Sequence, residues 1–403
     1  MKRLLCVIAL VMMVLLPIIA QGAQEQENVV NIAYFGTISG GQSEVGIMGR
    51  DAALLAAEHI NAAGGIKSLG GAKINLIVAD TTSDPSQAVA VAQRILGNTQ
   101  LSAIVQGGVS SVTMAYAPVT EKAGIPMLAG AVSDKLTQSG YKYFFQVCPS
   151  GGAFGAMQAS FLKYMVENYN VSGDKVGIIF ENTAYGQSTA AGIKTLCEKY
   201  GFKVVIEESY PANFTDATPL VTKVRQAGAE IIFPVSYTND AALIMSTMQS
   251  LNYKPIVIGG GAGFIWPEFA RALGRYAEGV FSVGSWSWDT INITRAPENL
   301  AATKAWKEKF GTFMPEMAGE VYSFVYIVKE AMEQAASADP KVLRDTLAKI
   351  KITSGRAAMM QPGTVEFTET GASKHVVPTI IQWQDGEVRT VFPVELTDNK
   401  IRW

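Results

Sequence analysis

The chain has 403 residues, of which 48% are hydrophobic and 17% are charged, and its formal net charge at pH 7 is −2. This balance, with no basic stripe in the sequence, argues against nucleic acid as a partner. A single hydrophobic core stops growing at roughly 250–300 residues, so a chain of this length is expected to form two domains.

The first residues have the pattern of a secretory signal peptide. Lys2 and Arg3 form a basic start, an apolar run follows at 4–19, and small residues at 20–23 provide a cleavage site. The apolar run is shorter than the ~20 residues that a membrane-spanning helix needs. We therefore expect residues 1–23 to be removed and the mature protein to be exported.

Cysteine and histidine are scarce in the rest of the chain. Cys148 and Cys197 remain after cleavage; a bridge between them is possible, but two buried thiols fit better, because Cys197 falls late in a predicted helix and Cys148 on a strand leading into another domain. His59 and His375 are far apart and lack the spacing of metal ligands. We therefore expect no metal site, no cofactor and no histidine base.

From residue 31 on, short apolar strands alternate with amphipathic helices, which is typical of a mainly parallel sheet covered on both faces. The first predicted strands are 31–39, 72–80, 102–107 and 126–131, and the helices between them are 44–63, 85–96 and 111–123. Pro85 can open its helix, and a left-handed glycine can close each helix, at Gly64, Gly97 and Gly124.

A second run of the same kind begins after Pro149 and predicts a second α/β domain. Its strands are expected at 176–181, 204–209, 231–235, 255–259 and 279–283, and its helices at 186–200, 216–227, 239–250 and 267–273. The pattern then changes to helices at 297–310, 319–336 and 340–350, followed by a hairpin of 376–384 and 387–392. These last pieces are too few to form a third core.

In open parallel sheets a ligand binds at the carboxyl ends of the strands, where several loops converge. The loops selected by that rule are 37–45, 81–84, 107–111 and 130–134 in the first domain and 182–187, 236–240 and 260–266 in the second. The loop 107–111 reads Gly-Gly-Val-Ser-Ser at the start of a helix, where free N–H groups and the helix dipole can hold a carboxylate. Helix capping by Ser110 or Ser111 explains the same serines.

The tyrosines Tyr185 and Tyr237 follow two strands of the second domain and can line an apolar pocket, although packing beneath their own loops is as common. Enzyme readings fit less well. The glycine run 259–263 resembles a dinucleotide fingerprint, but Phe264 occupies the position of the third glycine. No phosphate-binding loop or nucleophile elbow occurs, so the sequence favours binding without catalysis.

Four stretches together are specific: LAAEHINAAGGIKSLGG at 55–71, DTTSDPSQAVAVAQRIL at 80–96, AGAVSDKLTQSGYKYFFQ at 129–146 and ENTAYGQSTAAGIK at 181–194. Through them the chain resembles the periplasmic leucine/isoleucine/valine-binding protein family, the receptors of ABC transporters. The resemblance implies an α/β, type I periplasmic binding protein fold, with two doubly wound Rossmann-like lobes joined by a three-strand hinge. It places lobe 1 at 24–147 plus 288–351 and lobe 2 at 148–287 plus 352–403.

The resemblance also implies roles for particular residues. Ser110 matches the family serine that binds the ligand carboxylate, with backbone contacts at Gly130 and Ala131 beside it. Tyr185 and Tyr237 match aromatic contacts from the second lobe. The candidate ligand-binding residues are Ser110, Ser111, Gly130, Ala131, Val132, Ser133, Tyr185, Tyr237, Gly261 and Phe264.

Three positions depart from the family pattern. Val132 stands where branched-chain amino-acid binders have a threonine for the head group, Gly261 lies where they have an acid for the ammonium, and Val45 replaces a capping aromatic residue. An unpaired ammonium in a closed cleft is costly, so the missing acid weakens the amino-acid reading. A carboxylate or another polar small molecule with an apolar body competes with it, with Phe264 and Trp266 as walls.

The expected protein is thus a periplasmic monomer that closes on an amino acid or related carboxylate and presents it to an ABC permease in the cytoplasmic membrane. Two alternatives stay open. The same two-lobed protein can act as a sensor for a membrane receptor, or its ligand can be an aliphatic or aromatic acid or an amide without an α-amino group.

Overall fold

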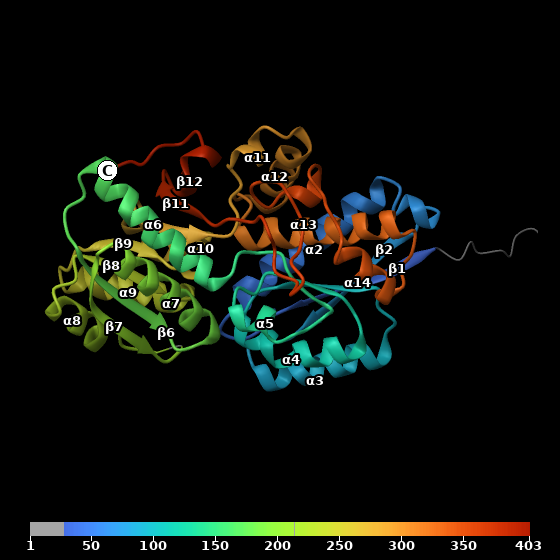
Figure 1. Cartoon of the computed structure of the whole chain (residues 1–403), viewed down its shortest axis with the longest axis horizontal. Helices are drawn as coiled ribbons and strands as arrows, with labels where there is room; N and C mark the ends of the chain where they lie inside the picture. The colour runs from blue at the N-terminus through green and yellow to red at the C-terminus, as the bar shows by residue number, and fades with distance from the viewer. Residues whose placement is uncertain (1–27, 213) are drawn as a thin grey trace, which may run out of the picture.

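The computed structural model describes residues 28–212 and 214–403, which form two lobes, each built on one β-sheet (Figure 1). The expected signal peptide at 1–23 lies outside these residues. Among the helices of the described ranges, none combines the length and the apolar character that a membrane span requires.

The first sheet has five parallel strands in the order β2-β1-β3-β4-β5. Its strands are β1 (Val29–Gly36), β2 (Lys73–Asp80), β3 (Ala103–Gly107), β4 (Met127–Ala129) and β5 (Phe144–Gln146). The helices that follow the first four strands are α2 (Ser43–Ala62), α3 (Pro85–Asn98), α4 (Ser110–Ala123) and α5 (Asp134–Gln138). Every residue of β3 is buried, as expected for a central strand covered on both faces.

The second sheet has seven strands in the order β12-β11-β10-β9-β8-β6-β7. Five of them repeat the parallel arrangement of the first sheet: β6 (Lys175–Glu181), β7 (Lys203–Tyr210), β8 (Ile231–Val235), β9 (Ile256–Gly259) and β10 (Phe281–Gly284). The hairpin of β11 (Thr379–Gln384) and β12 (Glu387–Phe392) extends it antiparallel. The helices are α6 (Gly151–Tyr169), α7 (Ala184–Lys199), α8 (Thr218–Gln226), α9 (Thr238–Ser250) and α10 (Pro267–Leu273).

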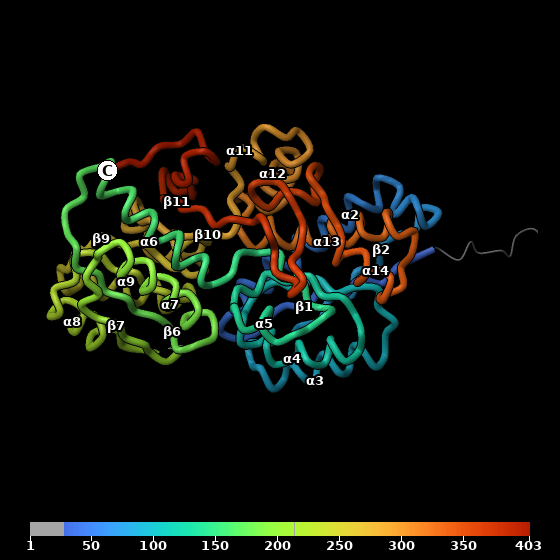
Figure 2. The backbone as a smooth tube through the Cα atoms, viewed as in Figure 1, coloured from blue at the N-terminus to red at the C-terminus, as the bar shows by residue number. Residues whose placement is uncertain are grey.

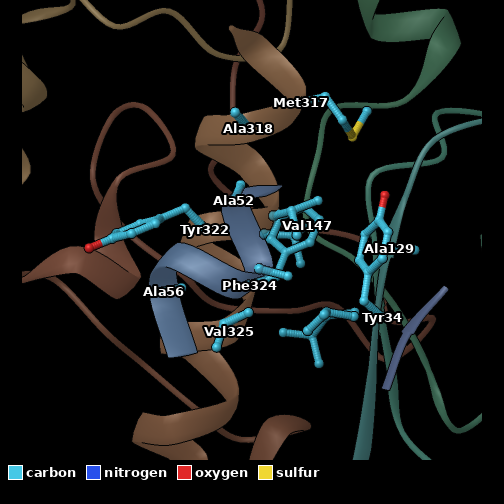
Figure 3. Packing of buried hydrophobic residues seen from close by; sticks show 14 of the residues in the cluster. Tyr34, Ala52, Ala56, Ala129, Val147, Met317, Ala318, Tyr322, Phe324 and Val325 are labelled. Atoms are coloured by element: carbon cyan, nitrogen blue, oxygen red, sulfur yellow. The ribbon is translucent and has the colours of Figure 1, made fainter. Parts of the chain in front are cut away.

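The chain passes between the lobes after β5, after β10 and before β11 (Figure 2). The helices after the second passage are α11 (Ile291–Thr294), α12 (Pro297–Phe310), α13 (Glu316–Ala335) and α14 (Pro340–Leu347). Helix α13 lies in the core of the first lobe, where Phe324 and Val325 lie close to Ala52 and Ala56 of α2 (Figure 3).

Residues 352–373, which the sequence assigned to the second lobe, pack against the first sheet instead. Gln146 at the end of β5 pairs with Ala372, and the ring of Phe367 lies 5.0 Å from that of Phe145. The apolar side chains of this segment, such as Val365, are buried in the same core as β5. The chain therefore leaves the first lobe after this segment rather than near Ile352.

The expected helix ends are partly confirmed. Asp84 caps α3 by accepting the N–H groups of Ser86 and Gln87, with Pro85 in the first turn, and Gly124 closes α4 in the left-handed conformation. Gly97, however, does not close its helix: α3 runs through it to Asn98. The two remaining cysteines, Cys148 and Cys197, are buried free thiols.

Helix α6 was not predicted, because its glycines at 151, 152 and 155 resemble a loop. The close packing of α6 on α7 explains them. A Cβ atom on Gly155 would lie 2.2 Å from the backbone oxygen of Thr189, and one on Gly192 of α7 would lie 2.3 Å from the backbone oxygen of Gly152. Side chains are absent here so that two helix backbones can touch.

Replacing Gly155 with alanine should lower the free energy of unfolding by about 1–3 kcal/mol, because the new methyl group collides with a backbone carbonyl in a closely packed contact. Gly97→Ala is the matched control: it is exposed within α3, and an added Cβ meets no atom within 4 Å. That change should stabilise the protein by up to about 1 kcal/mol through helix propensity. Urea denaturation of both variants measures the difference, and equal effects would contradict the packing argument.

Candidate functional site

A cleft lies between the lobes at the carboxyl ends of both sets of parallel strands, the position that the sequence selected. It contains an outer cavity of about 210 Å³ and an inner cavity of about 30 Å³. Val45, Tyr237 and Trp266 line both cavities, so the two are adjoining parts of one cleft. Residues from both lobes line each cavity.

The outer cavity is polar and acidic. Its first-lobe wall is the loop 40–45 after β1, and its second-lobe wall includes Glu181 at the end of β6 and residues 237–240 after β8. The loop 81–84 does not reach the cavity but supports it, since the Oγ of Ser83 accepts the N–H of Gln42. Burial, together with the negative charge of Asp240, raises the pKa of Glu181 to about 7.

Ser110 lies in the first turn of α4 and lines the inner cavity. The N-cap of α4 is Val109, and no side chain caps the helix, so the capping interpretation of Ser110 and Ser111 is wrong. The Oγ of Ser110 accepts the N–H of Ser133 at 3.2 Å. A hydroxyl held this way at a helix N-terminus can donate its own proton to an anion.

Five of the ten residues predicted from the sequence line the inner cavity: Ser110, Gly130, Val132, Tyr185 and Tyr237. The other five are not among its lining residues. Ser111 lies one position further along α4, and Ala131 is buried with its carbonyl accepting Nε2 of Gln146. Ser133 supports Ser110 through its backbone N–H.

The glycine loop after β9 contributes Ala262 rather than Gly261 or Phe264. The N–H of Gly261 donates to Oγ of Ser282 at 3.1 Å, which turns this residue toward its own sheet. Phe264 is fully buried, and its ring packs 5.2 Å from that of Phe269. The expected ligand wall at Phe264 is therefore part of the core, and Trp266 takes the position in the cleft.

The two tyrosines meet at the second-lobe wall. Their ring centroids lie 5.2 Å apart, and the hydroxyl of Tyr185 donates to the carbonyl of Gly260 at 2.6 Å. Burial raises the pKa of both tyrosines well above its ordinary value, so both are neutral hydroxyls. Tyr185 thus fixes the glycine loop, and Tyr237 forms the partition between the two cavities.

Sequence reasoning missed the acids of α13. Glu316 and Glu320, four residues apart on one face of the helix, line the inner cavity together with Ser285 after β10. Burial raises the pKa of Glu316 to about 7 and that of Glu320 well above its ordinary value. The signal in the sequence was the pair of acids four residues apart at the start of an apolar helix. It was missed because the helix was predicted to begin at 319, which left Glu316 outside it.

Another contact joins the lobes at the rim of the cleft. The hydroxyl of Thr238, in the first turn of α9, donates to Oε2 of Glu44 at 2.9 Å, and Glu44 belongs to the first turn of α2. The carboxyl of Glu268 in α10 neighbours that of Glu44. Burial and this second carboxyl raise the pKa of Glu44 to about 9.

The chemistry of the cleft is that of binding. Across the described ranges, His, Cys, Asp and Glu form no group of three or more that could hold a metal ion. The cavities are lined by hydroxyls, carboxyls, aromatic rings and a helix N-terminus, which come from both lobes. The chain passes between these lobes three times. Fold and site together define a two-lobed binding protein for a small molecule.

A family profile described as periplasmic binding protein matches residues 29–386, so the chain belongs to that family. The chain is 28% identical over 380 residues to Leu/Ile/Val-binding protein homolog 8 of Brucella melitensis, with 92% of each chain covered. The resemblance drawn from the sequence is thereby confirmed. The family consists of substrate-binding transport proteins rather than enzymes.

Two of the solved structures that share the fold illustrate the likeness. The leucine-binding protein LivK of Thermotoga maritima matches with a TM-score of 0.79 and 20% identity, over 90% of this chain and 98% of that chain. A fatty acid ABC transporter substrate-binding protein of Thermomonospora curvata matches with a TM-score of 0.76 and 17% identity, over 94% and 95%. At these identities the likeness concerns the fold alone, which serves receptors for different ligands.

The rim contact makes a prediction about pH. Glu44 binds a proton in the closed form up to about pH 9, whereas in an unfolded chain it releases that proton near pH 4.5. Below pH 4.5 Glu44 is protonated in both the folded and the unfolded state and does not change the free energy of unfolding. As the pH rises from 4.5 toward 9, this free energy falls, because only the unfolded chain can release the proton easily.

Glu44→Gln keeps the shape but cannot ionise, so it should gain stability relative to the wild type as the pH rises from 5 to about 9. Denaturant unfolding at a series of pH values measures this difference. Glu330→Gln, an acid beside Lys329 at the surface of the first lobe, is the control and should show no such trend. A constant difference between the Glu44 variant and the wild type would contradict the buried carboxyl pair.

Proposed function

We propose that the chain is the extracytoplasmic substrate-binding protein of an ABC transporter and that it closes its two lobes on an amino acid. One observation carries the proposal: the cleft sets the serine-bearing N-terminus of α4 in one lobe opposite the tyrosines of the other lobe. A ligand that contacts both walls binds the closed form better than the open form, and that difference in affinity drives closure.

The ligand carboxylate is held at the N-terminus of α4. Ser110 donates its hydroxyl, and the N–H groups exposed in the first turn favour a negative charge. Gly130 admits the ligand close to the backbone of the neighbouring loop, while Val132, Tyr185 and Tyr237 supply apolar contacts. Ala131, Ser133, Gly261 and Phe264 lie outside the cavity lining and support these positions from behind.

In the cell, the proposal implies a mature monomer in the periplasm after removal of residues 1–23, and an ABC permease as the partner that receives the ligand. Of the described residues, the first lobe comprises 28–147 plus 288 to about 373, because the segment 352–373 packs on β5. The second lobe comprises 148–287 and the remainder. Catalytic turnover of the ligand is not expected.

The main competing ligand class is an acid without an amino group, since a receptor for fatty acids shares this fold. The polar lining of the outer cavity, with the carboxyls of Glu44, Glu181 and Asp240, favours a ligand with hydrogen-bond donors over a fatty chain. A sensory role would involve the same closure of the lobes, but the closed protein would then bind a membrane receptor instead of an ABC permease.

Thermal unfolding in the presence of the twenty amino acids and of aliphatic and aromatic acids tests the function. An amino acid at 100 times its dissociation constant should stabilise the folded protein by about 2.7 kcal/mol and raise its melting temperature. If no amino acid shifts the transition while a fatty acid does, the amino-acid proposal is wrong. If an incubated ligand is recovered chemically changed, the protein is an enzyme instead.

Ser110→Ala should weaken binding of the stabilising amino acid about 10- to 100-fold, because a hydrogen bond to a charged group contributes about 1.5–3 kcal/mol. Ser111→Ala, one residue along the same helix and outside the cavity lining, is the control and should bind normally. Isothermal titration calorimetry measures both. Equal affinities of the Ser110 variant and the wild type would place the carboxylate elsewhere.

A further inference from the structure

Two glutamates of α13 share one serine hydroxyl at the base of the cleft. Oε1 of Glu316 accepts the backbone N–H of Ser285 and lies 2.7 Å from its Oγ. Oε1 of Glu320 contacts the same Oγ. Both carboxyls are buried, Glu320 with only 1% of its surface exposed, so the three groups form one network away from solvent.

The number of protons in this network is limited. A serine hydroxyl carries one proton and can donate to only one of the two carboxyl oxygens that it touches. The other contact is a hydrogen bond only if that carboxyl is itself protonated and donates to the serine. Glu316 already accepts the N–H of Ser285, so the proton belongs on Glu320. The pair then holds one proton and one negative charge.

One atom of the network has no partner. Oε2 of Glu320 is buried and makes no hydrogen bond within the described protein. It lies beside Gly130, where a Cβ atom would come within 2.5 Å of it, and both residues line the inner cavity. A buried acceptor without a donor is costly, so an oxygen in this place calls for a donor from a ligand.

The charge of the pair has no protein counterpart in the cleft. Neither cavity is lined by a lysine, arginine or histidine. Two other groups sense these carboxyls. Burial and then both glutamates raise the pKa of the Cys148 thiol, on which the carboxyl of Asp134 also acts, and burial, the neighbouring tyrosines and Glu316 raise the pKa of the Tyr185 hydroxyl. A negative charge buried among neutral and acidic groups takes up a proton unless a cation enters the cleft and balances it.

We propose that Glu316, Ser285 and Glu320 form the subsite for a positively charged amino group, so that the ligand class is a small molecule with a primary ammonium. The inference rests on the proposed binding function and narrows its ligand. The acid that is missing from the loop 260–262 is supplied instead by α13 of the first lobe. The ammonium donates to Oε2 of Glu320, and its charge is balanced by the single charge of the pair.

The position of this subsite suits an amino acid. Ser110 and Glu320 line the same inner cavity, so one small head group can present its carboxylate to the N-terminus of α4 and its ammonium to the carboxyls of α13. The inner cavity, at about 30 Å³, is far smaller than the outer one of about 210 Å³, so we expect the head group to enter it and the rest of the ligand to stay outside. The rest of the ligand then extends past Tyr237 and Trp266 into the outer cavity.

The test uses the full mature protein and matched ligand pairs, each an amino acid and the acid that lacks only its α-amino group, such as L-leucine and 4-methylpentanoate. Calorimetric titration should show that the wild type binds the best amino acid at least about 100-fold more tightly than its partner acid. Glu320→Met, which keeps the volume but removes the acceptor, should lose about 10- to 100-fold for the amino acid and little for the acid.

The double variant Glu316→Gln, Glu320→Gln removes the charge while preserving the shape, and it should show the same selective loss. Glu330→Gln on the surface of α13 should bind like the wild type. Melting temperatures without ligand verify the fold, since replacing buried carboxyls by neutral groups of similar size is often neutral or stabilising.

The outcomes separate the two proposals. If acids with and without the amino group bind equally, or if both glutamate variants bind the amino acid as the wild type does, the ammonium subsite is wrong while the binding function stands. If no compound of either series binds, the proposed function itself fails.

Discussion

The parallel direction of the strands is the constraint on which the rest of this molecule depends. When all strands of a sheet run the same way, every loop that leaves them emerges at one edge, and the helices that return the chain cover both faces. The two sheets repeat this arrangement, with β2-β1-β3-β4-β5 in one and β7-β6-β8-β9-β10 in the other. The passages of the chain between them turn these two edges toward one cleft.

A second constraint concerns charge. The core helix α13 carries apolar side chains such as Phe324 into the first lobe, yet its first turns bring two carboxyls to the base of the cleft. They are held by Ser285, which directly follows β10, where the chain leaves the second sheet. The proposed ligand site is therefore tied to a segment that connects the lobes, so under this proposal a group that binds these carboxyls also acts on the region about which the lobes would close.

Much of the fold could be predicted, because apolar periodicity is a local property. The strands, most helices and the edge where the loops converge followed from it, and Ser110 followed from a glycine-serine loop at a helix start. Helix α6 could not be predicted, because its glycines serve a contact with α7 that only the folded chain contains. Residues 352–373 were assigned to the wrong lobe because their pairing with β5 is a tertiary contact without a local signal.

The site was harder to predict, because its parts come from distant segments. Glu320 lies 210 positions from Ser110 in the chain, and nothing in the local sequence of either residue indicates that they share a cavity. Phe264 was expected in the cleft from its loop position, but Gly259 leaves space for its ring, since a Cβ there would lie 2.4 Å from Phe264. The ring of Phe264 therefore packs in the core beneath its own strand, and Trp266 lines the cleft instead.

The most direct measurement is a crystal structure of the protein with the amino acid that stabilises it most. We expect the ligand between the lobes, with its carboxylate at the N-terminus of α4 and its ammonium nitrogen about 2.7–3.2 Å from Oε2 of Glu320. An ammonium bound by other groups, with Oε2 of Glu320 still unpaired, would contradict the account.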